Sequence, residues 1–531
     1  MKVALTPWRF LERTERLFPD KTAIVCGESR ISFEAYGRRV RQLSRALGRM
    51  GAGSGDRVAY LGMNCHRLLE LYFAVLPGGV ILTPMNVRLH PDEMAFILND
   101  LEAKVLFVDD MFANLAASLV PKVPSLERVV LASSSVPSEE GWLAYETILA
   151  AEKPDPIGDL DVDEDQTAEI FYTSGTTGRP KGVMLTHRNL YLHALQNMIA
   201  LGLSDATVQI VGTVPLFHVN AWGTPQYAVA AGSTQVVVPR FDPESFLSAV
   251  ERERATFGMM VPAMLGDLTN FEGAERFDTS SLERIMIGGA PPPYSLLRAA
   301  SKKFGCEIQV GYGLTETCPV ISVATLKSHR LAAMDDEERY RRMSMTGLPL
   351  IGVEIKVIGD DGAEVAWDGK SMGEIVVRGD VVTKGYWKRP EETAEAFRGG
   401  YFHTGDVATV DSEGYLQIVD RKKDIIISGG ENISSVEVED ALYSHPDVRE
   451  CAVIGIPDER FGERPFAFVV RKAEGGASQE DLIRHVRERI AKFKAPAGIR
   501  FVEGLPRTGT GKVQKSELRK EFWEGRLRQV N

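Results

Sequence analysis

Residues 170–182 read Ile170-Phe171-Tyr172-Thr173-Ser174-Gly175-Thr176-Thr177-Gly178-Arg179-Pro180-Lys181-Gly182, and they say more about the fold than any other part of the chain. An apolar stretch leads directly into small, hydroxyl-bearing and cationic residues. Glycines let a backbone approach an anion closely, hydroxyl and N–H groups donate hydrogen bonds to it, and Lys181 adds positive charge. The run therefore predicts a phosphate-binding loop, although a plain hairpin turn has a similar composition.

The spacing of this loop does not fit the Walker pattern G-x-x-x-x-G-K-[ST]. A second glycine loop, near the end of the chain, comes closer to that pattern and reads Pro506-Arg507-Thr508-Gly509-Thr510-Gly511-Lys512. It has Pro506 where the leading glycine belongs, and Val513 in place of the Ser or Thr. Neither loop is therefore a Walker loop.

Helical periodicity alternates with short strands rich in Val, Ile and Leu on both sides of the first loop. The first ~320 residues are therefore predicted to form sheets flanked by helices, the α/β class. Closely spaced turns predict a β-rich subdomain at about 347–420, and a compact α/β unit follows Asp420. The expected helices include 34–50 and 68–75, and the expected strands include 57–61, 105–108, 128–131, 209–211, 235–238 and 284–289.

Length and composition exclude several classes of protein. The 531 residues predict roughly three or four domain-sized units of ordinary globular composition, with 44% hydrophobic and 25% charged residues. No apolar run approaches the ~20 residues that cross a bilayer, so we expect a cytoplasmic protein without an integral membrane segment. The net charge of −11 disfavours nucleic-acid binding. Five scattered cysteines without C-x-x-C spacing argue against disulfides and thiolate zinc sites.

Two further motifs offer groups that a nucleotide needs. The run Gly311-Tyr312-Gly313-Leu314-Thr315-Glu316-Thr317 combines a flat ring for a base with oxygen ligands for a hard cation, although it also fits a loop with a helix cap. Asp406 can accept hydrogen bonds from vicinal hydroxyls, as carboxylates do from ribose, or it is a plain turn residue. Residues 420–431 bring charges, an apolar strand and a glycine pair to the expected domain junction.

In this order and at these separations, the motifs resemble those of the adenylate-forming superfamily, which includes acyl-CoA synthetases, firefly luciferase and the adenylation domains of peptide synthetases. The resemblance implies an N-terminal domain at 1–420 and a small C-terminal domain at 421–531 that swings between two poses, with the site between them. It also implies a reaction in two halves. A carboxylate attacks the α-phosphate of ATP to give acyl-AMP and pyrophosphate, and the thiol of CoA then displaces AMP.

The resemblance assigns roles to the residues that match the motifs. Glu316 and Thr173 are expected to bind Mg²⁺, Thr315 lies near the phosphates, and Tyr312 stacks on adenine. Lys512 matches the mobile lysine that bridges the carboxylate and the α-phosphate. The other expected contacts are Ser174, Gly175, Thr176, Thr177, Gly178 and Lys181 at the β- and γ-phosphates, Gly288, Gly289, Ala290, Gly311 and Gly313 around adenine, and Asp406 and Arg421 at the ribose.

For the second half-reaction, the resemblance implies a hinge at Lys423. Rotation there would withdraw Lys512 and bring Ser428, Gly429 and Gly430 to a pantetheine tunnel, where glycines suit a narrow passage. No long insertion disturbs the junction, so free CoA is favoured as the acceptor over a carrier protein. The resemblance leaves a homodimer open.

The stretch from Pro215 to Gly223 indicates which class of acid is the substrate. Amino-acid-activating relatives have an aspartate one residue after the phenylalanine, where this chain has His218, so an amino-acid substrate is disfavoured. His218 would guard the carboxylate end of a substrate pocket that includes Gly288 and Gly311, or it is a core histidine. Trp222 would gate that pocket, or it is plain core. The stretch looks like medium- and long-chain fatty acyl-CoA synthetases of bacteria. A short-chain or aromatic acid, or loading of a carrier protein, remains the alternative.

Overall fold

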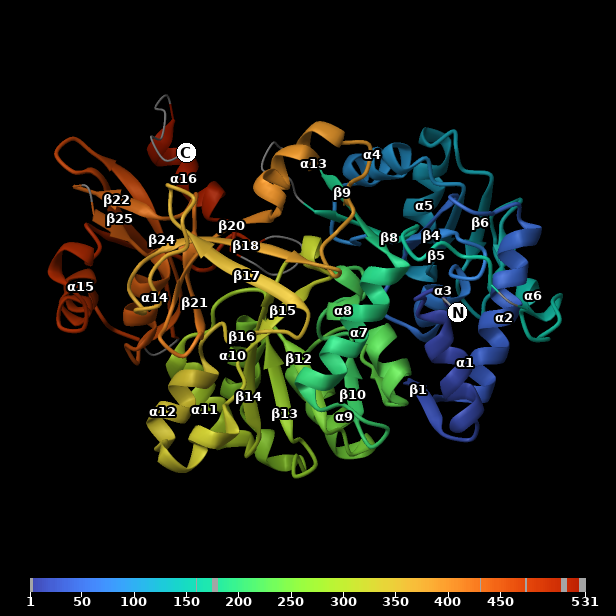
Figure 1. Ribbon diagram of the computed structural model, residues 1–531, viewed down its shortest axis with the longest axis horizontal. Coiled ribbons are helices and arrows are strands. Elements are labelled where there is room, and N and C mark those ends of the chain that lie inside the picture. Colours follow the sequence, from blue (N-terminus) through green and yellow to red (C-terminus); the bar gives the residue numbers. More distant parts are fainter. Residues whose placement is uncertain are drawn as a thin grey trace.

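The computed structural model describes residues 3–158, 160–173, 180–429, 431–472, 475–507 and 513–524. In this part of the chain the strands form two large sheets and two smaller ones (Figure 1). The first large sheet is mainly parallel and has the order β16 (Leu348–Pro349), β15 (Val320–Val323), β14 (Glu307–Gly313), β13 (Arg284–Ile287), β12 (Phe257–Met260), β10 (Val208–Val211), β11 (Thr234–Val237), β1 (Thr22–Cys26) and β2 (Ser29–Ser32).

The second large sheet carries the strand that precedes the predicted phosphate loop. Its strands β3 to β6 are parallel, whereas β8 and β9 form an antiparallel hairpin. Its order is β19 (Gly385–Tyr386), β9 (Lys181–Thr186), β8 (Thr167–Thr173), β4 (Ile81–Pro84), β3 (Arg57–Leu61), β5 (Val105–Val108), β6 (Arg128–Leu131) and β7 (Leu143–Ala144).

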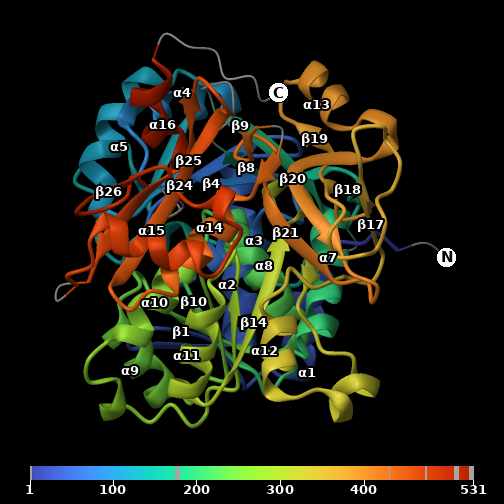
Figure 2. The ribbon, with the colours of Figure 1, turned by 90° about the vertical axis from the view of Figure 1, so that its left-hand side faces the viewer.

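Helices between the two large sheets complete the main core, as both ribbon views show (Figures 1 and 2). These are α2 (Phe33–Arg49), α3 (His66–Ala74), α7 (His187–Leu201) and α8 (Val219–Ala231). The side chain of Ser32 caps α2 by accepting from the N–H of Ala35, and left-handed Gly202 ends α7. The other helices of this part are α1 (Trp8–Leu17), α4 (Pro91–Leu101), α5 (Ala113–Leu119), α6 (Tyr145–Ala150), α9 (Pro243–Glu253), α10 (Pro262–Asn270), α11 (Tyr294–Phe304), α12 (Asp336–Met343) and α13 (Pro390–Ala396).

The two smaller sheets follow in the last third of the chain. An antiparallel sheet has the order β17 (Val353–Ile358), β18 (Gly373–Gly379), β20 (Phe402–Val410) and β21 (Leu416–Arg421). The last sheet has its own apolar core and faces the viewer in Figure 2. It consists of β23 (Glu431–Ile433), β22 (Ile426–Ser428), β25 (Gly462–Arg471), β24 (Val448–Asp458) and β26 (Ile499–Phe501), with α14 (Ser435–Tyr443), α15 (Gln479–Arg487) and α16 (Lys515–Trp523).

These elements confirm the predicted α/β class. The strands expected at 57–61, 105–108 and 128–131 are β3, β5 and β6, residue for residue. The strand expected at 284–289 ends at Ile287, because the backbone turns at Gly289, which has φ 83°. None of the helices in the described ranges is long and apolar enough to cross a membrane.

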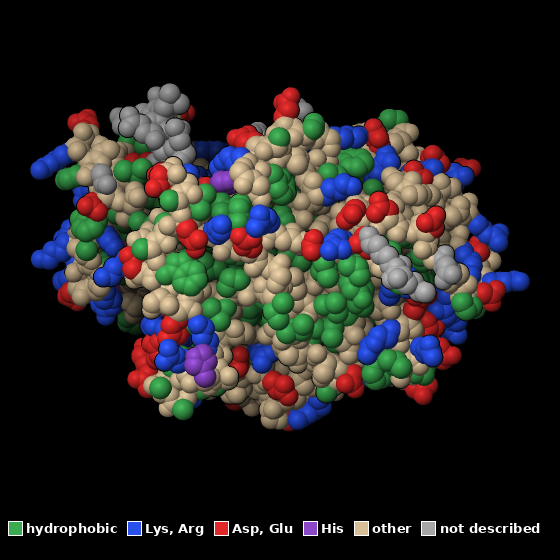
Figure 3. All heavy atoms as spheres, viewed as in Figure 1, with side chains coloured by type: hydrophobic (Ala, Val, Ile, Leu, Met, Phe, Trp, Pro, Cys, Tyr) green, Lys and Arg blue, Asp and Glu red, His purple; other side chains and the backbone are tan. Residues whose placement is uncertain are grey.

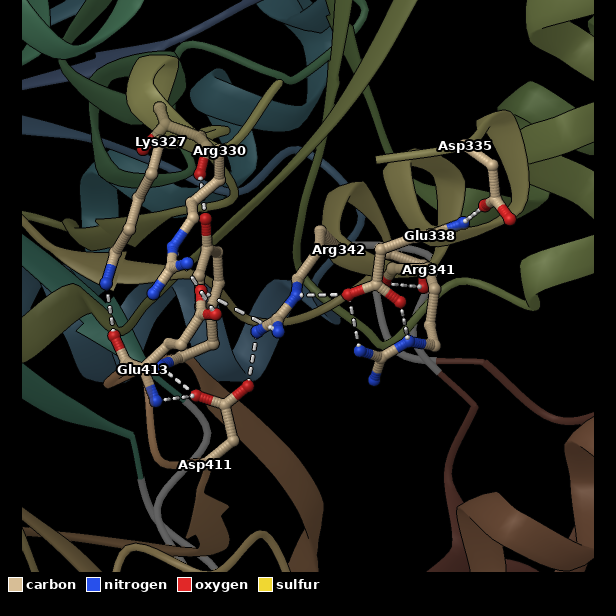
Figure 4. A network of polar contacts seen from close by, with 11 residues as sticks. Lys327, Arg330, Asp335, Glu338, Arg341, Arg342, Asp411 and Glu413 are labelled. Atoms are coloured by element: carbon tan, nitrogen blue, oxygen red, sulfur yellow. Dashed lines mark hydrogen bonds and ion pairs between the residues drawn. The ribbon is translucent and has the colours of Figure 1, made fainter. Parts of the chain in front are cut away.

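A buried arginine fastens α12 to the turn between β20 and β21 (Figure 4). Arg342 pairs with Asp411, lies 2.8 Å from Glu338 and stacks 4.5 Å from the ring centroid of Tyr415. Lys327 donates a hydrogen bond to the carbonyl of Glu413 in the same turn. A buried cation needs such partners, and here they fix the antiparallel sheet beside β14 and β15. Elsewhere on the face shown in Figure 3, both signs of charge are interspersed around apolar side chains near its middle.

Candidate active site

A cavity of about 1650 Å³ lies where the ends of β8, β13, β14 and β20 meet α14, β24 and α16. Most of the residues singled out from the sequence line it, although they come from segments far apart in the chain. They are Thr173, Lys181, His218, Trp222, Gly288, Gly289, Ala290, Gly311, Tyr312, Gly313, Thr315, Glu316, Asp406, Arg421 and Lys423. We call the part around Thr173, Lys181, Tyr312, Glu316, Asp406 and Arg421 the polar end, and the part around Trp222, Met286, Gly288, Val310 and Gly311 the apolar end.

The other expected site residues do not line the cavity or are not described. Ser428 and Gly429 belong to the hairpin of β22 and β23 and are not among the described residues that line the cavity. Ser174, Gly175, Thr176, Thr177, Gly178, Gly430 and Lys512 lie outside the described residues. The residues that flank the stretch with Lys512, Arg507 and Val513, form a β-bridge with each other, and both line the cavity.

At the polar end, a carboxylate, a phenol and a guanidinium meet on regular strands. The antiparallel register of β20 and β21 puts Asp406 directly opposite Arg421. The hydroxyl of Tyr312, on β14, donates to Oδ2 of Asp406 at 2.9 Å, and Nε of Arg421 lies 3.4 Å from Oδ1. Burial raises the pKa of Tyr312 well above its usual value, so the phenol stays a donor. The arrangement presents Asp406 with a fixed orientation at the cavity wall.

Glu316 and Lys181 lie on either side of Tyr386. The Tyr386 hydroxyl donates to Oε1 of Glu316 at 3.0 Å, and Nζ of Lys181 lies 5.4 Å from the centroid of the Tyr386 ring. Lys181 also forms an ion pair with Glu392 of α13. Burial raises the pKa of Glu316. A cation or an ammonium group near Glu316 would favour its charged form.

Sequence reasoning missed Tyr386 and Glu392. Each contacts an expected site residue, but both lie roughly 200 residues or more from Lys181, and neither stands in a motif for phosphate or metal binding. The only local signal is the aromatic pair Tyr386-Trp387 after Gly385.

Glu316 and Thr173 fit a site for Mg²⁺ that is completed by a ligand. Both offer oxygen donors, the type that Mg²⁺ prefers. Over the described ranges, no cluster of three or more His, Cys, Asp or Glu could hold a metal ion unaided. Since Mg²⁺ is commonly bound by one or two carboxylates together with substrate phosphates, these residues suit a metal that arrives with a nucleotide.

The apolar end is shaped by an unusual turn at the start of α8. Residues 219–223 all have positive φ, from 44° at Asn220 to 87° at Gly223. A left-handed conformation costs about 1–2 kcal/mol for each residue other than glycine, so the rest of the structure must hold this turn. His218 precedes the turn, and its N–H donates to the carbonyl of Pro215 at 2.9 Å. A regular helix from residue 219 would send Trp222 in another direction.

The turn places the Trp222 indole against Gly288, and Met286 lies against the neighbouring Gly311. A Cβ on Gly288 would lie 2.8 Å from Cη2 of Trp222 and 3.1 Å from the carbonyl oxygen of Gly311. A Cβ on Gly311 would collide with Cε of Met286. Trp222 is only 5% exposed. The indole and the thioether therefore fill the space that the two glycines leave, and together they close one side of the apolar end.

Comparison with protein families identifies the class of this site. The model of the AMP-binding enzyme family matches residues 11–387, and that of the AMP-binding enzyme C-terminal domain matches residues 437–512. The chain belongs to the AMP-binding enzyme family, which confirms the resemblance inferred from its motifs.

Individual relatives are similar over almost the whole chain. A long-chain-fatty-acid–CoA ligase of Thermus thermophilus is 40% identical over 531 residues, which cover 98% of this chain and 96% of the relative. A feruloyl-CoA synthase of Amycolatopsis sp is 38% identical over 515 residues, 96% of this chain and 98% of the relative. The crystal structure of the anthranilate CoA ligase AuaEII with anthranoyl-AMP has a TM-score of 0.89 at 27% identity and covers 98% of both chains. The three names refer to CoA ligation of different acids.

Proposed function

We propose that this protein is an ATP-dependent acyl-CoA synthetase whose acid is a medium- or long-chain fatty acid. The observation that carries the proposal is one cavity with a polar end built for a nucleotide and an apolar end built for a hydrocarbon. The names of the relatives support CoA as the acceptor. The reaction joins an acid to CoA with conversion of ATP to AMP and pyrophosphate.

In the first half-reaction, the acid carboxylate attacks the α-phosphorus of ATP, and pyrophosphate leaves. Asp406 accepts hydrogen bonds from the ribose hydroxyls beside Arg421, while Tyr312 stacks on adenine against Gly288, Gly289 and Ala290. Thr173 and Lys181 hold the β- and γ-phosphates together with the loop at 174–178. The ion pair between Lys181 and Glu392 must then break, because the phosphates carry more negative charge than the single carboxylate. Lys512 neutralises charge where the carboxylate meets the α-phosphate.

Glu316 would be the protein's carboxylate ligand for Mg²⁺ in this proposal, together with the hydroxyl of Thr173. The metal, when bound, neutralises charge on the phosphates. Glu316 is half-buried beside the cavity and accepts a hydrogen bond from Tyr386, which fixes its orientation. The nearby Arg421 favours its ionised form.

In the second half-reaction, the CoA sulfur attacks the acyl carbonyl and AMP leaves. We propose that the domain at 421–531 rotates about Lys423 against the domain at 1–420, so that Ser428, Gly429 and Gly430 form the pantetheine passage. Arg507 and Val513 line the cavity and Ser428 and Gly429 do not, which suits the pose that forms the adenylate. A hinge movement lets one site run both steps.

A fatty acid is proposed because the apolar end presents an indole, a thioether and the aliphatic side chain of Val310. His218 lines the cavity and, in this proposal, guards the carboxylate end of the acid. Short-chain and aromatic acids stay the second candidates, since relatives are named for both fatty and feruloyl substrates. A homodimer and a cytoplasmic location stay predictions of the sequence.

Release of AMP tests the proposal. The protein is incubated with ATP and Mg²⁺, with and without CoA, over straight-chain acids from C2 to C18, benzoate and a cinnamate. We expect AMP release that depends on CoA and peaks at a medium or long chain. Equal release without CoA would indicate another acceptor, and a maximum with benzoate or the cinnamate would replace the fatty acid by an aromatic one.

A further inference from the structure

Glu169 is a fully buried carboxyl group that the reaction does not use. It lies on β8 and is 0% exposed. Side chains alternate along a strand, so Glu169 shares its face with Phe171 and Thr173, both of which line the cavity. A carboxyl group is costly to bury without hydrogen-bond partners, so its contacts indicate what it does.

Both oxygens of Glu169 accept hydrogen bonds from α8. Nδ2 of Asn220 donates to Oε2 at 2.7 Å, and Nε2 of Gln226 donates to Oε1 at 2.7 Å. One donor, Asn220, lies inside the left-handed turn at 219–223, and the other, Gln226, lies three residues after it. Asn220 is itself fixed, because its Oδ1 accepts from the N–H of Gly223 at 2.6 Å. The carboxyl group thus binds the turn itself and the helical segment that follows it.

The opposite side of the turn is also fitted closely. A Cβ on Gly223 would lie 2.7 Å from the ring of His193, and Nε2 of that ring accepts from the N–H of Val320 at 3.0 Å. The hydroxyl of Thr224 donates to the carbonyl of Ala221. The turn is therefore held between β8 and α7, and its strained backbone depends on these contacts.

We propose that Glu169 is a positioning residue for the acid: through the side-chain amides of Asn220 and Gln226 it holds the turn that keeps Trp222 against Gly288, and so sets the shape of the apolar end. That the apolar end binds the acid rests on the proposed function. Glu169 acts through these amides and does not contact the reacting atoms.

The hydrogen-bond pattern predicts which substitutions Glu169 tolerates. Within the described structure, Oε1 of Gln226 is buried without a partner. In Glu169→Gln, the new amide oxygen can accept from Asn220, and its NH₂ can donate to Gln226 after that side chain turns over. Glu169→Leu has a similar volume but leaves both amides unpaired. Glu169→Gln should therefore keep the two hydrogen bonds to α8 that Glu169→Leu removes.

Steady-state AMP release separates positioning from general damage. We expect Glu169→Leu to raise the KM for the best acid roughly 10- to 100-fold and to broaden the chain-length profile, while the KM for ATP stays within about threefold. Glu169→Gln stays within about threefold of wild type for both substrates. An unchanged acid KM and profile in Glu169→Leu would overturn the proposal, as would a Glu169→Gln enzyme as impaired as the leucine variant.

A second variant guards against misfolding of Glu169→Leu. Asn220→Gly removes one of the two hydrogen bonds to Glu169 and also the bond that Asn220 accepts from Gly223, yet glycine adopts a φ near 44° without strain. We expect its KM for the acid to rise about threefold to 30-fold, while its KM for ATP stays unchanged. Wild-type values for both substrates in Asn220→Gly would count against the inference even if Glu169→Leu could not be purified.

A measurement without turnover distinguishes this inference from the proposed function. Acrylamide quenching of Trp222 is obtained as the difference between each protein and its Trp222→Phe partner. We expect strong shielding in wild type and Glu169→Gln, and several-fold faster quenching in Asn220→Gly and Glu169→Leu. If no acid supports AMP release, the proposed function fails, whereas equal shielding of Trp222 in all four proteins overturns the role of Glu169.

Discussion

At the polar end of the cavity, Tyr312, Asp406 and Arg421 stand on regular strands, whereas at the apolar end Trp222 stands on a left-handed turn. Strand register alone sets Asp406 opposite Arg421. By contrast, the turn has a left-handed backbone that is costly for residues other than glycine, and the side chains of Glu169, Asn220 and Gln226 hold it. The polar end is thus specified by secondary structure, and the apolar end by a few buried polar contacts that can change without altering the sheets.

The largest expected effect concerns the residue that joins the two ends during adenylation. We expect Lys512→Ala to slow adenylate formation about 10³-fold, because the charge that it would neutralise develops in that step. Thioester formation from supplied acyl-AMP should stay within a few-fold of wild type. Pre-steady-state measurement of each half-reaction checks this, with Gly430→Leu as the reciprocal variant. Equal losses in both halves for either variant would contradict the two-pose assignment.

Asp406→Ala tests the polar end by itself. Hydrogen bonds to charged groups are the stronger ones, and loss of this carboxylate also leaves Tyr312 without its acceptor, so the KM for ATP should rise roughly 100-fold. The KM for the acid should change little. Tyr312→Phe, which keeps the ring and removes one donor, serves as the matched control and should lose less. A parallel rise in both KM values would mean that the two ends are not separable.

Gly223→Ala tests the apolar end in the opposite sense. The new methyl group meets the His193 ring at 2.7 Å in a backbone with φ 87°, so the turn has to shift. We expect about a tenfold rise in the KM for the acid, a lower Tm and little change in the KM for ATP. Gly202→Ala is the control, because it lies in a left-handed helix end with open space around it. The Tm of Gly202→Ala should fall, while its KM for the acid should stay unchanged.

The smallest expected effect is a pH dependence of stability that belongs to Glu169. Burial raises its pKa from 4.5 to about 8. The fold therefore favours the protonated form, and this contribution is fully present below about pH 4.5 and is lost as the pH rises through about 8. Nearby Tyr72 and Cys318 stay neutral over this range, because burial raises their pKa well above the usual values.

Glu169→Gln lacks this titration and is the comparison. Between about pH 6 and about pH 9, wild type should lose roughly 2 kcal/mol of stability relative to Glu169→Gln. Thermal unfolding midpoints of both proteins across this range measure the difference. A constant difference in Tm would show that Glu169 does not titrate there.

The same contrast explains what the sequence could predict. Strands such as β3 and β5 are predicted by local runs of apolar residues. The composition of the sequence after Thr173 likewise predicts a phosphate site. The turn at 219–223 has no such signature, since it needs Glu169 from a strand some 50 residues earlier. Tyr386 and Glu392 were missed for the same reason: their function comes from tertiary neighbours. Glu169 itself reads as an outlier in an apolar strand, a signal that could have been used.

Gly288 and Gly311 form a wall that both ends of the cavity share. A larger residue at either position would push on Trp222 or Met286, and it would also disturb the strand ends that carry Gly289 and Tyr312. In evolutionary terms these positions are pleiotropic, because a substitution there that alters the acid pocket also alters the nucleotide site. Descendants of this enzyme that acquire a new substrate should therefore accumulate their substitutions in α8 and α10, while the two glycines stay under purifying selection.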